Sequence, residues 1–196
     1  FTAFTVIAYL PPTPTPTPLT PIILVPGMGA SWNYEALVHG ASVADIDWKI
    51  APYVKMYDGL ISALESAGDE LGNNLLVYAY DWRRNAGDTA NNLNQFIADH
   101  FASGEVNLVG HSLGGLVARA YAQSHPERID RLIAVGSPHQ GVAQAYYLWE
   151  GVDLQGFDGW QKLAIRLLLR INRQNYNSEV AEVQAFLPSL RNILPV

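Results

Sequence analysis

The chain has 196 residues, of which 49% are hydrophobic, and a formal net charge of −6. This length corresponds to one domain of ordinary size that can bury a substantial core. The acidic balance argues against a nucleic-acid-binding protein, which would need clustered Lys and Arg residues. Because the chain has no cysteine, the sequence excludes disulfides, thiolate metal sites and a cysteine nucleophile.

The first 21 residues differ in composition from the rest of the chain. Residues 1–10 are rich in β-branched and aromatic side chains, which predicts a strand, interpreted as a remnant of a preceding domain. Residues 11–21 alternate proline with threonine, which favours an extended polyproline II segment. We interpret this stretch as an interdomain linker of an extracellular or cell-surface protein; the alternative is an irregular arm packed on the domain surface.

Apolar strands alternate with amphipathic helices between residues 22 and 141. The apolar runs predict strands at 22–25, 75–80, 106–109 and 132–135. Helical periodicity predicts helices near 55–67, 89–101 and 113–124. This alternation is typical of an α/β protein with a parallel sheet covered by helices on both faces. In such sheets the chemistry gathers beyond the carboxyl ends of the strands, where the glycine-rich and polar motifs of this chain fall.

Residues 142–196 contain no strand-like run. They predict one helix at 160–173 and a second at 178–186 with Ser178 as its N-cap. The first of these helices carries a basic stripe formed by Lys162, Arg166, Arg170 and Arg173. We interpret this part as an all-helical cap laid over the sheet. The basic helix is either a packed cap helix or a mobile lid that contacts a lipid interface.

A nucleophile motif lies between the third predicted strand and the helix that follows it. The run Gly110-His111-Ser112-Leu113-Gly114 fits the pattern G-x-S-x-G, in which a sharp, strained turn exposes the serine hydroxyl. We therefore expect Ser112 to be a nucleophile. The N–H of Leu113, at the start of a helix, would face a developing oxyanion. The glycine turn after the first strand could supply a second donor, the N–H of Met28.

Four motifs follow one another along residues 22–141. They are Ile23-Leu24-Val25-Pro26-Gly27-Met28-Gly29, Tyr80-Asp81-Trp82-Arg83, Gly110-His111-Ser112-Leu113-Gly114-Gly115 and Gly136-Ser137-Pro138-His139-Gln140-Gly141. In this order the sequence resembles the α/β-hydrolase lipases, more narrowly those similar to lecithin–cholesterol acyltransferase, and the last motif also resembles bacterial triacylglycerol lipases. The resemblance implies hydrolysis or acyl transfer of lipid-like esters through an acyl-enzyme on Ser112, with Met28 and Leu113 as oxyanion donors.

The sequence after Ser112 offers no clear catalytic acid or histidine. In this fold both partners follow the serine along the chain, and only His125 and His139 do so here. We expect His125 at the far end of the next helix, His139 beside the site in a structural or lining role, and His111 pointing away from it. The later carboxylates follow no strand end and are expected to be solvated or capping charges: Glu127, Asp130, Glu150, Asp153, Asp158, Glu179 and Glu182.

We therefore expect a fragment of an α/β-hydrolase fold whose C-terminal strands, with the acid and the histidine, are absent. Such a chain would be inactive or incomplete by itself and would need further domains or a C-terminal fragment of the same protein. Its predicted organisation is a remnant strand at 1–10, a linker at 11–21, a hydrolase core at 22–141 and a helical cap at 142–196.

Further residues near the predicted site are candidates for a substrate pocket: Trp32, Asp81, Trp82 and His139. Asp81 paired with Arg83 could shape its loop or contact substrate, and Trp32 could line an acyl pocket or simply pack. The sequence contains no metal-ligand spacing and no nucleotide-binding glycine pattern, so we expect no metal or cofactor. The expected partner is a lipid or ester substrate. Two alternatives to ester hydrolysis stay open, namely acyl transfer and a catalytically silent lipid-binding or interaction domain.

Overall fold

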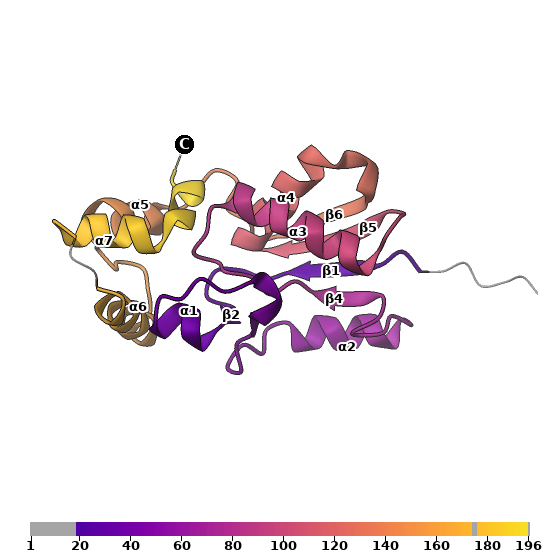
Figure 1. Cartoon of the computed structure of the whole chain (residues 1–196), viewed down its shortest axis with the longest axis horizontal. Helices are drawn as coiled ribbons and strands as arrows, with labels where there is room; N and C mark the ends of the chain where they lie inside the picture. Colours follow the sequence, from indigo (N-terminus) through magenta and orange to yellow (C-terminus); the bar gives the residue numbers. More distant parts are fainter. Residues whose placement is uncertain (1–18, 174–175, 196) are drawn as a thin grey trace, which may run out of the picture.

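The computed structural model describes residues 19–173 and 176–195, and its centre is a four-stranded parallel sheet (Figure 1). The strands are β1 (Ile22–Val25), β4 (Leu75–Val77), β5 (Val106–His111) and β6 (Ile129–Val135), in the order β4–β1–β5–β6. Leu24 is in register with Val77 on one side and with Val109 on the other. The predicted α/β class and the presence of all four predicted strands are confirmed, but β4 ends three residues before the predicted end at 80 and β6 begins three residues before the predicted start at 132. The predicted strand at 1–10 and residues 11–18 of the predicted linker lie outside the described residues.

Seven α-helices occur in the described part of the chain. They are α1 (Tyr34–Val38), α2 (Asp58–Ser66), α3 (Ala86–His100), α4 (Leu113–Ser124), α5 (Ala143–Gly151), α6 (Gly159–Ile171) and α7 (Glu179–Phe186). Five of them were predicted from periodicity. Helix α3 begins three residues before its predicted start, because the side chain of Asn85 accepts the N–H of Gly87 and caps the helix there.

The sequence did not predict α1, α5, or the antiparallel pair of β2 (Ser31–Trp32) and β3 (Lys49–Ile50). These two strands are too short for an alternating pattern of polar and apolar residues to be recognised, and α1 is little more than one helical turn. Three 3₁₀ turns complete the described elements: η1 (Asp45–Asp47), η2 (Pro126–Arg128) and η3 (Pro188–Ile193).

The two faces of the sheet are covered unequally. Ile23 and Leu24 of β1 point to opposite faces, and both are buried. At the β6 edge, however, Leu132, Ile133 and Val135 are 37%, 50% and 49% exposed. Helix α4 packs on one face of β5 and β6, and no described strand pairs with the outer edge of β6. The prediction of a sheet covered on both faces is therefore wrong at this edge.

The elements after β6 form a helical group beyond the carboxyl ends of the strands (Figure 1). No strand occurs among the described residues after 141, as predicted. This group is joined to the loop after β4, where Ser189 N donates to the carbonyl of Arg83 at 2.8 Å and Ala86 N donates to Asn192 Oδ1 at 2.9 Å. No helix in the described ranges is long and apolar enough to cross a bilayer.

Candidate active site

Ser112 occupies a strained turn between β5 and α4. Its φ of 51° and ψ of −125° lie in a region that residues other than glycine rarely adopt, at a cost of about 1–3 kcal/mol. Among the described residues other than glycine, only Ser112 and Val152 have a positive φ. The N–H of Ser112 donates to the carbonyl of Val135 at 2.9 Å, so β6 supports the strained residue directly.

The three glycines around Ser112 are required by close packing. A Cβ atom on Gly114 would lie 2.1 Å from the carbonyl oxygen of Val25, and one on Gly110 would lie 2.5 Å from Cα of Gly115. A Cβ atom on Gly115 would in turn lie 1.8 Å from Oγ of Ser137. These distances are far shorter than van der Waals contact, so only glycine allows β5, α4 and the ends of β1 and β6 to meet here.

Two groups of backbone N–H donors lie next to the serine. Leu113 is the first residue of α4, and the first N–H groups of a helix have no partner within it. On the other side, the turn after β1 is closed by a 3.2 Å hydrogen bond from Ala30 N to Gly27 O, with Gly29 at a φ of 75°. A Cβ atom on Gly27 would lie only 3.1 Å from Cβ of Ser112. The turn that contains Met28 therefore lies directly against the serine.

Tyr57 links this turn to the serine motif. Its Oη accepts the N–H of Gly27 at 3.0 Å and lies 3.0 Å from Nδ1 of His111. The two rings meet edge to face with centroids 5.8 Å apart. Burial lowers the pKa of His111. Sequence reasoning missed Tyr57, because nothing in its local sequence indicates a contact with residues 30 and 54 positions away.

A family model described as the alpha/beta hydrolase fold matches residues 20–171. The chain belongs to the α/β-hydrolase fold family. Its structure contains the elements that the sequence motifs indicated, in the same order: strand β1, the glycine turn after it, the strained turn at Ser112 and helix α4.

Solved structures similar to this α/β-hydrolase share little sequence with it. The mature lipase BlEst2 of Bacillus licheniformis is 21% identical, with a TM-score of 0.49 over 93% of this chain and 62% of that chain. The monoacylglycerol lipase of Paleococcus ferrophilus is 20% identical, with a TM-score of 0.43 over 78% of this chain and 49% of that chain. The chain therefore spans less than two thirds of the length of either lipase.

A curated protein matches a shorter segment more closely. A 1-acylglycerol-3-phosphate O-acyltransferase of Arabidopsis thaliana is 44% identical over 57 residues, which are 29% of this chain and 10% of that protein. The match therefore concerns one segment of each protein.

No described histidine is hydrogen-bonded to Oγ of Ser112 in this α/β-hydrolase. His139, which was predicted near the site, is exposed, and its Nδ1 accepts from Arg119 at 3.4 Å. His125 lies at the far end of α4, as predicted, where it contacts Glu127 at 3.7 Å. His111 binds Tyr57 through Nδ1. Among the described residues, Ser112 thus lies beside the first residue of α4 and the turn that contains Met28, and no histidine is hydrogen-bonded to its Oγ.

The carboxylates after Ser112 also do not approach it through any hydrogen bond in the described residues. Asp158 forms a capping box with Gln161 at the start of α6, so its predicted capping role is confirmed. Glu182 lies in the first turn of α7, as predicted, but it is only 7% exposed and is therefore not a solvated charge. Its burial results from packing of α7 within the helical group, which the local sequence does not show.

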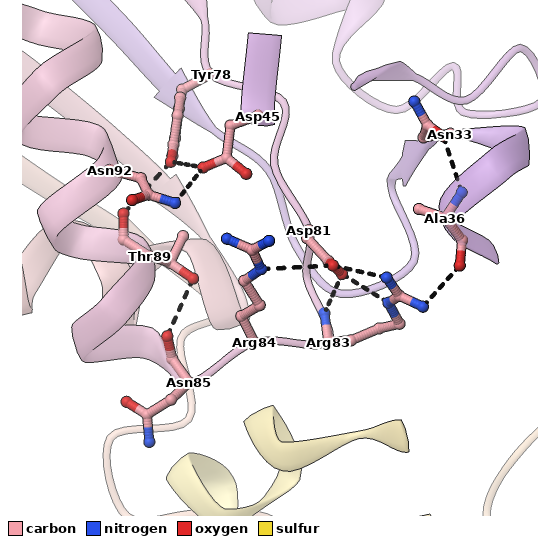
Figure 2. Close-up of polar contacts among 10 residues, drawn as sticks. All are labelled: Asn33, Ala36, Asp45, Tyr78, Asp81, Arg83, Arg84, Asn85, Thr89 and Asn92. Atoms are coloured by element: carbon pink, nitrogen blue, oxygen red, sulfur yellow. Dashed lines mark hydrogen bonds and ion pairs between the residues drawn. The ribbon is translucent and has the colours of Figure 1, made fainter. Parts of the chain in front are cut away.

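Asp81 and Arg83 form a buried ion pair after β4 (Figure 2). Nε and Nη2 of Arg83 donate to Oδ1 and Oδ2 of Asp81, both at 2.7 Å. The remaining Nη1 donates to the carbonyl of Ala36 at 2.8 Å. The guanidinium also lies over the rings of Trp48 and Phe186, at 5.7 and 5.3 Å from their centroids. Of the two predicted roles for this pair, the contacts favour shaping the loop.

The other predicted pocket residues have contacts of their own. Trp82 is 7% exposed and its Nε1 donates to the carbonyl of Ser31 at 2.9 Å, so its indole connects the loop after β4 to strand β2. Trp32 is half-buried on β2. Neither of the two best-defined cavities among the described residues is lined by Ser112, Trp32 or His139. An acyl pocket lined by Trp32 or His139 therefore stays a prediction.

The larger cavity has a volume of about 510 Å³ and lies between the loop at residues 42–46 and α3. Its polar wall is a small network in which Oδ2 of Asp45 accepts from Oη of Tyr78 at 2.6 Å and from Nδ2 of Asn92 at 2.9 Å (Figure 2). Burial, with the nearby Asp45 carboxylate as the second cause, raises the pKa of Tyr78 far above its usual value. Tyr78 is thus a neutral donor that anchors the loop.

Proposed function

We propose that this α/β-hydrolase cleaves carboxylic esters of lipids, as a lipase or esterase, through an acyl-enzyme on Ser112. The observation that carries the proposal is the strained Ser112 with the glycine turn of Met28 packed against it. Strain that the surrounding structure maintains is typical of functional positions. The lipid-like substrate class rests on the resemblance of the four motifs to lipases.

The proposed chemistry follows from the backbone around Ser112. Oγ of Ser112 attacks the ester carbonyl carbon while a general base takes its proton, and the resulting oxyanion accepts hydrogen bonds from the N–H groups of Leu113 and Met28. Collapse of this intermediate breaks the bond to the alkoxy oxygen, which receives that proton and leaves as the alcohol, and the acyl group stays on Oγ. Water then attacks the acyl carbon and gives a proton to the same base, and the base returns it to Oγ as the fatty acid leaves.

We further propose that the general base and its carboxylate come from polypeptide outside the described residues. All five histidines of the chain are described, and none is hydrogen-bonded to Ser112 Oγ. The open edge of β6, with exposed Ile133 and Val135, offers unpaired backbone groups to a further parallel strand. A segment that adds there would reach the same carboxyl end of the sheet as Ser112.

A second candidate function is acyl transfer to an acceptor other than water. It is favoured by the 57-residue similarity to the Arabidopsis thaliana protein named as an acyltransferase and by the Tyr80-Asp81-Trp82-Arg83 motif. Both activities share the acyl-enzyme, so products formed with and without an added alcohol acceptor distinguish them. A silent lipid-binding domain is the third candidate, and it requires lipid binding without any acyl-enzyme.

A fluorophosphonate probe tests the proposal, since it forms a covalent bond with an activated serine. Protein of full natural length should be labelled at Ser112, whereas its Ser112→Ala variant should not. The 196-residue chain should be labelled far more slowly than the longer protein. No labelling of the longer protein, under conditions that label other serine lipases, would contradict the proposal.

We also propose an extracellular or cell-surface location from the composition of residues 11–21. Fractionation of the source cells tests this location.

A further inference from the structure

Helix α6 exposes an apolar stripe on its outer side. Leu163, Leu167 and Ile171 are 70%, 53% and 43% exposed, and their four-residue spacing places them one above another on the helix. The opposite side is fastened to the protein. Leu169 is buried there, and at the end of the helix Nδ2 of Asn172 donates to the carbonyl of Leu37 at 2.6 Å. The stripe therefore faces outward on an anchored helix.

Cations lie beside this stripe. Arg166 and Arg170 are exposed and follow Leu163 and Leu167 by three residues each, so they are their neighbours on the helix surface. Residues 159–173 carry four cations and no carboxylate, in a chain whose net charge is −6. None of the ion pairs between described residues includes a cation of this segment.

The apolar stripe and the neighbouring arginines of α6 together favour one kind of binding partner. An exposed leucine stripe loses contact with water only if something apolar covers it, and the adjacent unpaired guanidinium groups favour an anionic surface. A helix with an apolar stripe and an adjacent basic stripe binds in the plane of an anionic membrane, its apolar side chains at the acyl boundary and its cations at the phosphates. Packing two copies of the chain through this surface would bring the arginines of both copies together, which is unfavourable.

We propose that the outer surface of α6, formed by Leu163, Leu167, Ile171, Arg166 and Arg170, docks this protein on anionic phospholipid membranes. Figure 1 shows α6 at the end of the molecule beyond the carboxyl ends of the strands, beside α1. Docking through α6 would place the membrane on the side of the sheet where the strands end and where Ser112 follows β5. The inference goes beyond the proposed hydrolase activity and does not depend on an acyl-enzyme.

Co-sedimentation of the 196-residue chain with vesicles tests the proposal directly. One set of vesicles contains phosphatidylserine and phosphatidylcholine, and the other contains phosphatidylcholine alone. We expect binding to the anionic vesicles, weakened by salt, and much weaker binding to the zwitterionic ones. The variant Arg166→Gln/Arg170→Gln should bind the anionic vesicles about 30-fold less tightly. The variant Leu163→Gln/Leu167→Gln should bind them roughly tenfold less tightly.

A matched control exists on another surface. Ile46 is 76% exposed and the side chain of Arg131 is also 76% exposed, so Ile46→Gln/Arg131→Gln removes the same kinds of groups and should bind as the wild type does. The Ser112→Ala variant should also bind unchanged, which separates docking from hydrolysis. Thermal unfolding shows whether each variant is folded.

Three results would overturn the proposal. They are no binding of the wild type to anionic vesicles, equal binding to both kinds of vesicle, and α6 variants that bind like the Ile46→Gln/Arg131→Gln control. Sedimentation velocity provides a further test, since a wild-type dimer that the α6 variants dissociate would assign this surface to a second copy of the chain instead.

Discussion

Oη of Tyr57 lies 3.0 Å from Nδ1 of His111 while it accepts the N–H of Gly27 at 3.0 Å. One phenol thus fastens the glycine turn to the residue that precedes the nucleophile. The two segments also pack directly against each other at Gly27 and Ser112, and this pair of hydrogen bonds adds a second link between them. Tyr57 therefore acts on the proposed chemistry through the two segments that it joins.

Replacing Tyr57 with phenylalanine should loosen this connection. Tyr57→Phe leaves the N–H of Gly27 without its acceptor, and we expect a loss of about 1–2 kcal/mol in the free energy of unfolding. The ¹⁵N spectrum of His111 should also report a changed ratio of its two tautomers, because the hydrogen-bond partner of Nδ1 is gone. Tyr53→Phe is the control, since Tyr53 donates an exposed 3.2 Å bond to Gly29 O and should cost less than about 0.5 kcal/mol. An unchanged His111 spectrum in Tyr57→Phe would contradict the assignment.

The lowered pKa of His111 should make stability depend on pH in a defined direction. Above the unfolded pKa of about 6.5, the ring is neutral in both states and its contribution is fully present. As the pH falls from there towards the lower folded pKa, the unfolded chain binds the proton first, and stability decreases. Urea unfolding between pH 5 and 8 should show this decrease, and His111→Gln should reduce its slope. An equal slope in the variant would rule out His111 as its source.

Backbone strain at Ser112 should lower the free energy of unfolding by an amount that substitutions can measure. Glycine adopts the φ of 51° without a steric penalty, so Ser112→Gly should raise the free energy of unfolding by about 1 kcal/mol. Ser112→Ala keeps the strain and should be near the wild type. Both variants remove the hydroxyl, so the difference between them isolates the backbone effect. Chemical denaturation of the three proteins measures it. Because glycine also raises the conformational entropy of the unfolded chain, a Ser112→Gly variant less stable than Ser112→Ala would mean that the turn is not strained.

The glycine contacts around the serine predict a large effect of a single methyl group. Gly114→Ala places a Cβ atom 2.1 Å from the carbonyl oxygen of Val25, and we expect a loss of about 3 kcal/mol or more. In Gly59→Ala the new methyl group on α2 meets nothing within 4 Å, so this control should gain about 0.5–1 kcal/mol. Thermal unfolding shows whether each substitution lowers or raises the stability. A mild effect at Gly114 would show that β1 and α4 can separate without cost.

The buried Asp81–Arg83 pair should be far more sensitive than a surface pair. Arg83→Met leaves the Asp81 carboxylate, 5% exposed, with only the backbone N–H of residue 83 at 3.2 Å and Arg84 at 3.6 Å. We expect a loss of about 3–5 kcal/mol. Arg131→Met at the exposed pair with Asp130 should change stability by less than about 1 kcal/mol. Urea unfolding provides both values, and similar losses at the two sites would contradict the role of Arg83 as an anchor of the loop.

Local sequence predicted much of the architecture around the serine. Strand β1, helix α4 and the N-cap at Ser178 were found from apolar runs, helical periodicity and capping residues. These features depend on residues that are close along the chain, and their physical causes operate over a few positions. For the same reason the position of Ser112 between a strand and a helix was predictable.

The sequence by itself determined the parallel α/β architecture and the strained turn at Ser112, because hydrophobic periodicity and glycine spacing act locally. Only the tertiary structure decided that Tyr57 joins the glycine turn to His111, that Glu182 is buried and that Leu163 and Leu167 face outward beside unpaired arginines. Each of these depends on which distant segments pack together. A pattern along one segment shows which side chains share a face, whereas packing decides whether that face meets protein or solvent.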